Sequence, residues 1–286
     1  MKIDASTEIY GVLGNPIRHS LSPILQNGWI EESGYNAVYL AFEPKPEVFT
    51  SALAGLAHAQ IKGLNVTAPF KSEAAKMAIK KTIEVEQIGA ANTLKLCENG
   101  YEAANTDGKG LVLDLDNRAA HWRENAEIVT ILGVGGAAKG ILAALLSAGV
   151  KEIRLVGRDG FKSAETARIA KALPNSENTI IQRYSWEEMA IAVVDAGLLI
   201  NATPIGLDSG NSLNWNLEYT RQNAIIYDMT YAQKESEFLK LAKAQNRLAL
   251  NGLGMLVGQG AFAFEIWFGH LPDFKQGLHR LMKLER

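Results

Sequence analysis

The sequence has a single cysteine, Cys97, among its 286 residues. One cysteine excludes an intrachain disulfide framework and is typical of a reducing compartment. Cys97 follows the strand-like run NTLKL, where a small packing residue is the ordinary interpretation. The five histidines show no paired spacing that would make a zinc site, so we expect no bound metal.

Long apolar runs and an excess of either charge are also missing. No apolar run reaches the roughly 18 residues of a membrane-spanning helix, and the amino terminus lacks the apolar region of a signal peptide. A formal net charge of -2 provides no basic field for nucleic acid or an anionic membrane. We therefore expect a soluble, cytoplasmic protein that binds neither nucleic acid nor a membrane.

The pattern from residue 128 onward alternates short β-branched runs with amphipathic stretches. The strand candidates are EIVTILG, KEIRLVG, NTIIQRY, GLLINAT, AIIYDM and RLALN, and helical runs such as AAKGILAALLSAG lie between some of them. Such alternation predicts an α/β domain with a parallel, doubly wound sheet.

The first 110 residues alternate in the same way and form a separate unit. EIYGVLG, AVYLAFE and KGLNVTA read as strands, and SPILQNGWIEES, PEVFTSALAGLAHAQ and KSEAAKMAIK as helices. ANTLKL and YEAAN are joined through Asn99-Gly100, which predicts a β-hairpin. A boundary near residues 108–111 separates this unit from the next, and the aromatic tail after Asn251 is predicted to be helical.

The segment GVGGAAKG, residues 133–140, sits between a strand and a helix, as a dinucleotide-binding turn must. Gly133 permits a tight bend, Gly135 lets a pyrophosphate approach, and Ala138 allows close helix packing. The amides of Gly136 and Ala137, which open the helix, would face the phosphates. The alternative is a tight turn without a ligand, since a lone match to this motif is weak.

The end of the next strand offers signals for both nicotinamide cofactors. Arg158 and Lys162 suit the 2′-phosphate of NADP, whereas Asp159 suits the ribose hydroxyls of NAD or would repel the phosphate. The plain alternative is three solvated charges in a loop. We predict NADP, with NAD as an alternative.

Three segments of the first half carry candidate chemistry. In NVTAPFK, Lys71 follows a strand and could exchange protons, but taken alone it reads as an exposed lysine in the first turn of a helix. In NTDGKG, Asp107 is either a carboxylate partner or a helix cap. In GNPIRHSLSP, Ser22 before Pro23 suits a helix N-cap, and with Ser20 it also suits an anion site.

These segments together with GAANTL and GLGMLVGQG, in this order around GVGGAAK, strongly resemble the shikimate dehydrogenase family, including its quinate/shikimate members. The resemblance covers nearly the whole chain. It implies a substrate-binding, catalytic domain of residues 1–109 and 251–286, completed by the C-terminal helices, around a Rossmann-type NAD(P)-binding domain of residues 110–250.

The resemblance also implies roles for individual residues. Lys71 and Asp107 would be the catalytic pair, and Ser20 and Ser22 would hold the substrate carboxylate. The remaining matches are Thr67, Asn92, Gln259 and Tyr231 toward the substrate, and Thr203, Met229 and Gly254, from NATPIGL, YDMTY and GLGM, toward the cofactor. The implied reaction is the reversible NADP-dependent reduction of 3-dehydroshikimate to shikimate, a small-molecule substrate, by a monomer or homodimer.

The sequence departs from the family pattern in four places. Gln26 stands where histidine is frequent, Ala68 replaces a larger residue, Gly260 replaces the usual alanine, and Gly157-Arg158-Asp159 replaces the common Asn-Arg-Thr. These departures leave two alternatives open: a quinate/shikimate paralogue that uses NAD or NADP, and a non-catalytic sensor of the same fold. A sensor would usually have lost Lys71 or Asp107, and both are present.

Overall fold

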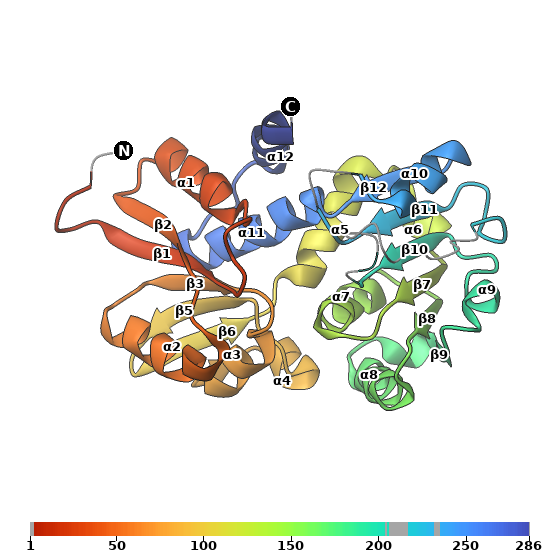
Figure 1. Cartoon of the computed structure of the whole chain (residues 1–286), viewed down its shortest axis with the longest axis horizontal. Coiled ribbons are helices and arrows are strands. Elements are labelled where there is room, and N and C mark those ends of the chain that lie inside the picture. Colours follow the sequence, from red (N-terminus) through yellow and green to blue (C-terminus); the bar gives the residue numbers. More distant parts are fainter. Residues whose placement is uncertain (1–2, 204, 206–216, 232–234, 286) are drawn as a thin grey trace. The chain divides into compact units, whose positions relative to one another are not determined.

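A computed structural model describes residues 3–203, 205, 217–231 and 235–285 of the chain. The chain forms two compact units, one of residues 1–110 with 256–286 and the other of residues 111–255, each built on one six-stranded sheet (Figure 1). The sequence placed the divisions at 109/110 and 250/251. Over the described residues, no helix has both the length and the apolar composition to cross a membrane.

The sheet of the first unit is mixed, with the strand order β2-β1-β3-β5-β6-β4. Its strands are β1 (Glu8–Leu13), β2 (Ala37–Phe42), β3 (Gly63–Val66), β4 (Lys80–Lys81), β5 (Thr93–Cys97) and β6 (Gly100–Ala104). β1 pairs in parallel with β2 and β3, whereas β5 runs antiparallel to β3 and β6. The predicted hairpin of β5 and β6 is confirmed, and Asn99 and Gly100 turn it with φ values of 69° and 148°.

Five of the helices described in this unit lie in runs predicted to be helical, one of which is shorter than predicted, and the helix at residues 83–88 was not predicted. The helices are α1 (Ser22–Ser33), α2 (Phe49–His58, after a 3₁₀ turn at Pro46–Val48), α3 (Lys71–Met77), α4 (Ile83–Ile88), α11 (Leu253–Phe268) and α12 (Phe274–Met282, before a 3₁₀ turn at Lys283–Glu285). The helix predicted over residues 71–80 ends at Met77. Lys80 and Lys81 instead pair with β6 as the short edge strand β4.

The C-terminal helix α11 packs on the sheet of the first unit. The indole Nε1 of Trp267 donates to the carbonyl oxygen of Leu94 at 3.0 Å, and its ring lies 5.4 Å from that of Tyr10. A Cβ atom at Gly63 would collide with the Trp267 indole, so only glycine permits this packing. The aromatic tail therefore belongs to the core of the first unit, although it comes last in the sequence.

Two helices contain the divisions between the units. Helix α5 (Asp107–Arg118) passes from the first unit into the second after Gly110, and α11 returns after Met255. Within the first unit the backbones of the two helices are in close contact at Gly110 and Gly258. A Cβ atom at Gly258 would lie only 2.6 Å from the carbonyl oxygen of Gly110, so the contact requires glycine there. The backbone that follows Asp107 is thereby packed against the backbone around Gln259.

The second unit has an entirely parallel sheet with the order β12-β11-β10-β7-β8-β9. Its strands are β7 (Ile128–Leu132), β8 (Glu152–Val156), β9 (Ile180–Tyr184), β10 (Leu198–Asn201), β11 (Ile225–Asp228) and β12 (Leu248–Asn251). Its remaining helices are α6 (Trp122–Asn125), α7 (Gly136–Ser147), α8 (Gly160–Ala172), a 3₁₀ turn at Ser176–Asn178, α9 (Met189–Ala192) and α10 (Glu237–Ala244). The strand order reverses at β7, and ligands of doubly wound sheets bind at such a switch point. The predicted Rossmann-type architecture is confirmed.

Candidate active site

The first unit brings two of the sequence motifs together where β1 and β3 end. The amide of Thr67 donates to the carbonyl oxygen of Leu13 at 2.9 Å, and the amide of Asn15 donates to that of Ala68 at 3.2 Å. The loop after β1 carries Ser20, and the loop after β3 carries Thr67 and leads to Lys71. Parallel pairing of β1 and β3 therefore places the anion candidates and the lysine at one edge of the sheet.

Lys71 and Asp107 form an ion pair in this region. The ammonium Nζ of Lys71 lies 2.6 Å from Oδ2 of Asp107, and only 22% and 7% of the two side chains are exposed. Lys71 is thus not the exposed first-turn lysine that the sequence allowed. Asp107 begins α5, and its carboxylate engages Lys71 and Asn92 instead of acting as a cap, so that alternative is also wrong.

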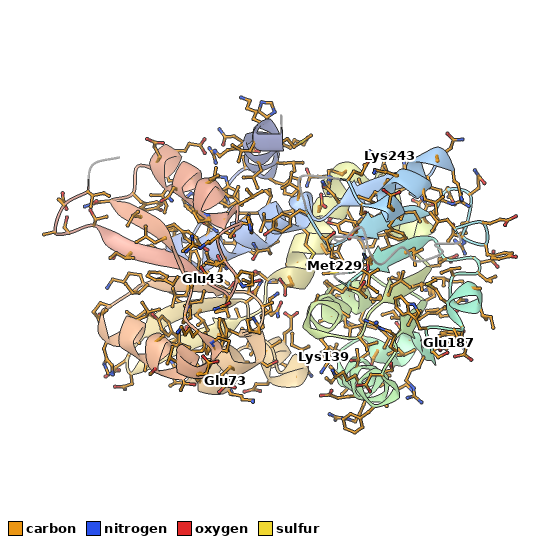
Figure 2. The ribbon with its side chains drawn as sticks, viewed as in Figure 1. Glu43, Glu73, Lys139, Glu187, Met229 and Lys243 are labelled. Carbon is orange, nitrogen blue, oxygen red and sulfur yellow. The ribbon has the colours of Figure 1, made fainter. Side chains whose placement is uncertain are left out.

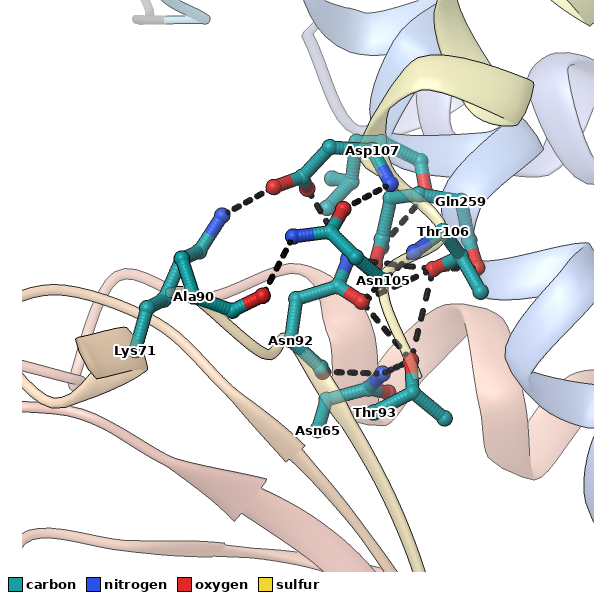
Figure 3. A network of polar contacts seen from close by, with 10 residues as sticks. Asn65, Lys71, Ala90, Asn92, Thr93, Asn105, Thr106, Asp107 and Gln259 are labelled. Atoms are coloured by element: carbon teal, nitrogen blue, oxygen red, sulfur yellow. Dashed lines mark hydrogen bonds and ion pairs between the residues drawn. The ribbon is translucent and has the colours of Figure 1, made fainter. Parts of the chain in front are cut away.

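The carboxylate of Asp107 is held from its other side by Asn92 (Figure 3). The amide Nδ2 of Asn92 donates to Asp107 Oδ1 at 2.9 Å, to Thr106 Oγ1 at 3.0 Å and to Gln259 Oε1 at 3.3 Å. Two amide hydrogens thus serve three acceptors. Gln259 has the longest of these contacts, so its Oε1 retains capacity to accept from a ligand hydroxyl.

Four further polar residues complete a buried network that the sequence did not single out: Asn65, Thr93, Asn105 and Thr106, each at most 4% exposed. Asn105 Oδ1 accepts from the amide of Asp107 at 3.0 Å, and its Nδ2 donates to the carbonyl oxygen of Ala90 at 3.1 Å. Thr106 Oγ1 donates to the carbonyl oxygen of Gln259 at 3.0 Å. The sequence did contain a signal for this network: polar residues stand in or directly after strands that are otherwise apolar. Because buried polar groups need hydrogen-bond partners, such residues indicate a buried polar network.

The serines stand at the start of α1, but not as predicted. Ser22 is the first helical residue, and Leu21 occupies the N-cap without a side-chain hydrogen bond, so the prediction of Ser22 as the cap is wrong. The Oγ of Ser20 accepts weakly from the amide of Ser22 at 3.3 Å. Ser22 is 6% exposed, whereas Ser20 and Thr67 are half-buried.

A second carboxyl group, that of Glu84, interacts electrostatically with Asp107 and Lys109. Burial raises the pKa of Glu84 to about 7; the charge of Lys109 opposes the rise and that of Asp107 adds to it. Glu84 lies in the first turn of α4, whose C-terminal Gly89 leads into the segment that carries Asn92. The sequence analysis did not identify it.

The glycine turn of the second unit has the shape of a phosphate site. Gly133 has a φ of 106°, and α7 begins after Gly135 without a side-chain cap, so its first amides are free to face an anion. A Cβ at Gly135 or Gly136 would meet no atom within 4 Å, which leaves room for a ligand. Ala137 is half-buried on the first turn, and Ala138 behind it is fully buried.

The charged residues after β8 have different surroundings. Arg158 and Lys162 are exposed, as the plain interpretation of loop charges predicts. Asp159 is more than a loop charge, because it caps α8: its Oδ1 accepts from the amides of Phe161 at 3.0 Å and Lys162 at 3.1 Å. Only its second oxygen remains for other partners.

The other cofactor candidates surround the ends of β10 and β11 within the second unit. Thr203 Oγ1 donates to Asn201 Oδ1 at 2.6 Å, and Thr203 lies against the turn, 2.8 Å from where a Cβ on Gly133 would be. The amide of Met229, labelled in Figure 2, donates to the carbonyl oxygen of Asn201 at 3.0 Å. Pro204 and residues 206–207 of the NATPIGL motif lie outside the described residues.

Gly254 and Tyr231 also belong to the second unit. A Cβ at Gly254 would collide with the buried carboxylate of Asp114, so packing within the second unit by itself requires glycine at this position. Tyr231 is half-buried, and burial raises the pKa of its phenol. Within the first unit, Lys71, Asp107, Asn92 and Gln259 lie together, and Tyr231 belongs to the second unit.

Comparison with known proteins identifies the relatives of this chain. Residues 12–94 match the shikimate dehydrogenase substrate binding domain, and residues 252–282 match the shikimate 5′-dehydrogenase C-terminal domain. The shikimate dehydrogenase (NADP(+)) of Caulobacter vibrioides is 36% identical over 96% of this chain and 94% of its own length. The chain belongs to the shikimate dehydrogenase family.

Solved structures of the family have the same fold. The shikimate dehydrogenase of Aquifex aeolicus superimposes with a TM-score of 0.86 at 32% identity, covering 98% of this chain and 99% of the other. The enzyme of Thermus thermophilus, solved with NADP(H) and shikimate, gives a TM-score of 0.85 at 27% identity, covering 97% and 99%.

Two of the departures from the shikimate dehydrogenase pattern contact each other. The Nε2 of Gln26, which is 1% exposed, donates to the carbonyl oxygen of Gly260 at 3.0 Å, and a Cβ at Gly260 would lie 3.3 Å from that nitrogen. The missing methyl group at Gly260 therefore leaves space for the Gln26 amide.

Packing also explains the glycine at position 157, since a Cβ there would lie 2.5 Å from Ser163 Oγ. Ala68 is exposed in the loop before Pro69.

Proposed function

We propose that this chain catalyses the reversible, NADP-dependent interconversion of 3-dehydroshikimate and shikimate, an oxidation and reduction at a CH–OH carbon. The observation that carries the proposal is the Lys71–Asp107 pair at 2.6 Å, held in a buried network next to Asn92 and Gln259. A non-catalytic sensor would not need to keep such a pair. The named relatives of the family support the same reaction.

The substrate is assigned to the first unit, at the edge where β1 and β3 end. Ser20 and Ser22 would hold the carboxylate at the start of α1, where helix amides favour an anion. Thr67, Asn92 and Gln259 would bind the ring hydroxyls, with Gln259 Oε1 as the acceptor that has most capacity to spare. Tyr231 remains the substrate-binding candidate of the second unit.

Oxidation of the alcohol releases a proton from the reacting hydroxyl, and the pair is suited to handle it. In oxidation the neutral amine of Lys71 would accept that proton and become the ammonium that pairs with Asp107, and in reduction the ammonium would return it. A base positioned in this way typically contributes about 10²–10⁴-fold to the rate. Asp107 would hydrogen-bond the hydroxyl and fix the lysine. Asn92 and Asn105 hold Asp107 by its carboxylate and its amide, so the geometry is set before the substrate binds.

The second unit is proposed as the nucleotide-binding domain, and its residues fit a dinucleotide. The space in front of Gly135 and Gly136 and the uncapped start of α7 suit a pyrophosphate. When NADP⁺ is bound, its oxidised nicotinamide would accept the hydride from the alcohol carbon, and the reduced nicotinamide would supply it in the reverse direction. Arg158 and Lys162 would hold the 2′-phosphate, while Thr203, Met229 and Gly254 would line the nicotinamide side.

Initial rates test this proposal directly. Shikimate and quinate are each paired with NADP and with NAD, and reduction of the nicotinamide is followed by absorbance. We expect the highest kcat/KM for shikimate with NADP. Equal rates with quinate would support the broader paralogue instead, and no turnover from folded protein that binds NADP would refute the dehydrogenase assignment for these substrates.

A further inference from the structure

Asp228, the last residue of β11, has a completely buried carboxylate. Its Oδ1 accepts from the backbone amide of Thr230 at 3.1 Å, from the Thr230 hydroxyl at 2.8 Å and from the side-chain amide of Asn201 at 3.2 Å. Its Oδ2 accepts from the hydroxyl of Ser236 at 2.6 Å. The carboxyl group therefore acts only as an acceptor, which is the behaviour of its ionised form.

Within the part of the chain that the structure describes, this carboxylate has no cation as a partner. Asp228 forms no ion pair with a described lysine, arginine or histidine. Asp114, which is also completely buried in the second unit, is instead paired with Arg118. A buried charge without a cation is costly unless hydrogen bonds compensate it, as the four donors do here. Asp228 therefore keeps a fixed negative charge inside the unit.

The charge stands at the edge of the sheet where a dinucleotide binds. Asp228 ends β11, which pairs in parallel with β10, and β10 pairs with β7 (Figure 1). Dinucleotides bind outside the carboxyl ends of the strands, across the point where the strand order reverses. The phosphate turn follows β7, and the proposed 2′-phosphate site follows β8 on one side of it. The nicotinamide half therefore falls to the other side, where β10 and β11 end.

The surroundings of Asp228 include two residues assigned to the cofactor. Thr203 Oγ1 donates to Asn201 Oδ1 at 2.6 Å, and the amide nitrogen of Asn201 in turn donates to Asp228. Met229 follows Asp228 directly, and its backbone amide donates to the carbonyl oxygen of Asn201 at 3.0 Å. One side chain thus separates the buried charge from Thr203, and all of these contacts lie within the second unit.

We propose that the charge of Asp228 makes the second unit bind the oxidised cofactor more tightly, relative to the reduced one. The nicotinamide ring is a cation in NADP⁺ and neutral in NADPH, so a fixed negative charge near it attracts only the oxidised form. Because the carboxylate is buried, salt screens this attraction less than at the surface. Asp228 acts through its charge and is not a catalytic residue. The inference rests on the proposed function, which makes NADP the cofactor.

Two substitutions of Asp228 remove the charge. Asp228→Asn keeps the size of the side chain, and the Ser236 hydroxyl can turn to accept from the new amide. We expect the ratio of the NADP⁺ to the NADPH dissociation constant to rise about threefold to fifteenfold, as for one charge acting over about 10–20 Å at an effective dielectric constant of about 20. Asp228→Ser loses more hydrogen bonds but the same charge, so it should raise the ratio by a similar factor.

Ser236→Ala is the matched control for a purely structural effect. It removes the hydrogen bond to Asp228 Oδ2 and the cap of α10, where Ser236 Oγ accepts from the amide of Leu239 at 3.4 Å, but it leaves the charge. The lost cap should make this variant unfold at a lower urea concentration than wild type. Its ratio of the two dissociation constants should stay within about twofold of the wild-type ratio, because the charge is unchanged.

Dissociation constants of the full chain for NADP⁺ and NADPH are measured by isothermal titration calorimetry without substrate. The inference is overturned if the Asp228 variants weaken the binding of both forms by one factor, or if Ser236→Ala changes the ratio as much as they do. Wild-type protein that binds both forms but does not oxidise shikimate would contradict the proposed function and leave this comparison valid. Wild-type protein that binds neither form would overturn both.

Discussion

Replacing Lys71 by methionine tests the centre of the proposed mechanism. Methionine keeps most of the side-chain length but removes the ammonium that lies 2.6 Å from Asp107. If Lys71 exchanges the proton of the reacting hydroxyl, kcat should fall by about 10²–10⁴-fold, which corresponds to roughly 3–5 kcal/mol of transition-state stabilisation. Substrate affinity should change far less, because the carboxylate and hydroxyl contacts remain.

The same substitution leaves a buried carboxylate without its cation. The Asp107 side chain is 7% exposed, and among the described residues its oxygens keep only the amide of Asn92 as a hydrogen-bond partner. Breaking a fully buried pair costs about 3–5 kcal/mol, and because Lys71 is 22% exposed we expect a smaller loss of unfolding free energy, about 1–3 kcal/mol. Stability and activity should therefore both fall in Lys71→Met.

The double variant Lys71→Met/Asp107→Asn separates the two effects. It removes both charges, so its unfolding free energy in urea should return toward the wild-type value. Its kcat should remain as low as that of Lys71→Met, because residues that act as one unit do not lose activity additively. A Lys71→Met enzyme with kcat within threefold of wild type would refute the role of Lys71. Recovery of kcat in the double variant would show that the loss of kcat in Lys71→Met came from the unpaired buried carboxylate of Asp107 and not from the missing amine.

Three further predictions concern the surroundings of the site. Gly110→Ala should lower the unfolding free energy in urea by about 1–3 kcal/mol and lower kcat, because the new methyl group would collide with the backbone of Gln259. The control is Gly55→Ala, where a helical glycine has open space around it. This variant should instead raise the unfolding free energy by about 0.5–1 kcal/mol. Gly133→Ala should weaken NADP⁺ binding in calorimetry, since alanine tolerates a φ of 106° poorly, and an unchanged dissociation constant would contradict the role of this turn. The folded-state pKa of Glu84 is raised to about 7 from 4.5, so its contribution to stability is present below pH 4.5 and is lost as the pH rises through 7. Glu84→Gln should therefore gain unfolding free energy relative to wild type between pH 5 and pH 8, by at most about 3 kcal/mol. A pH-independent difference between the two proteins would contradict that pKa.

Much of the fold could be predicted from local patterns. The strand that leads into the glycine turn, the helix after it and the Asn99-Gly100 hairpin follow from side-chain periodicity and from residues that tolerate positive φ, which act within a few positions of the chain. Errors occurred where a local signal competed with a contact elsewhere. Lys80 ends a predicted helical run but pairs with β6 as part of β4, and Ser22 resembles a cap but lies inside the helix.

The sequence by itself determined the order of the elements, the position of the phosphate turn and the residue types available for acid–base chemistry. Only the tertiary structure decided which of those residues meet. Lys71 and Asp107 are 36 positions apart, and Thr106 and Gln259 are 153 apart. Their contacts depend on strand register and on the glycine contact between α5 and α11, because periodicity specifies which face a side chain occupies but not which distant group it reaches.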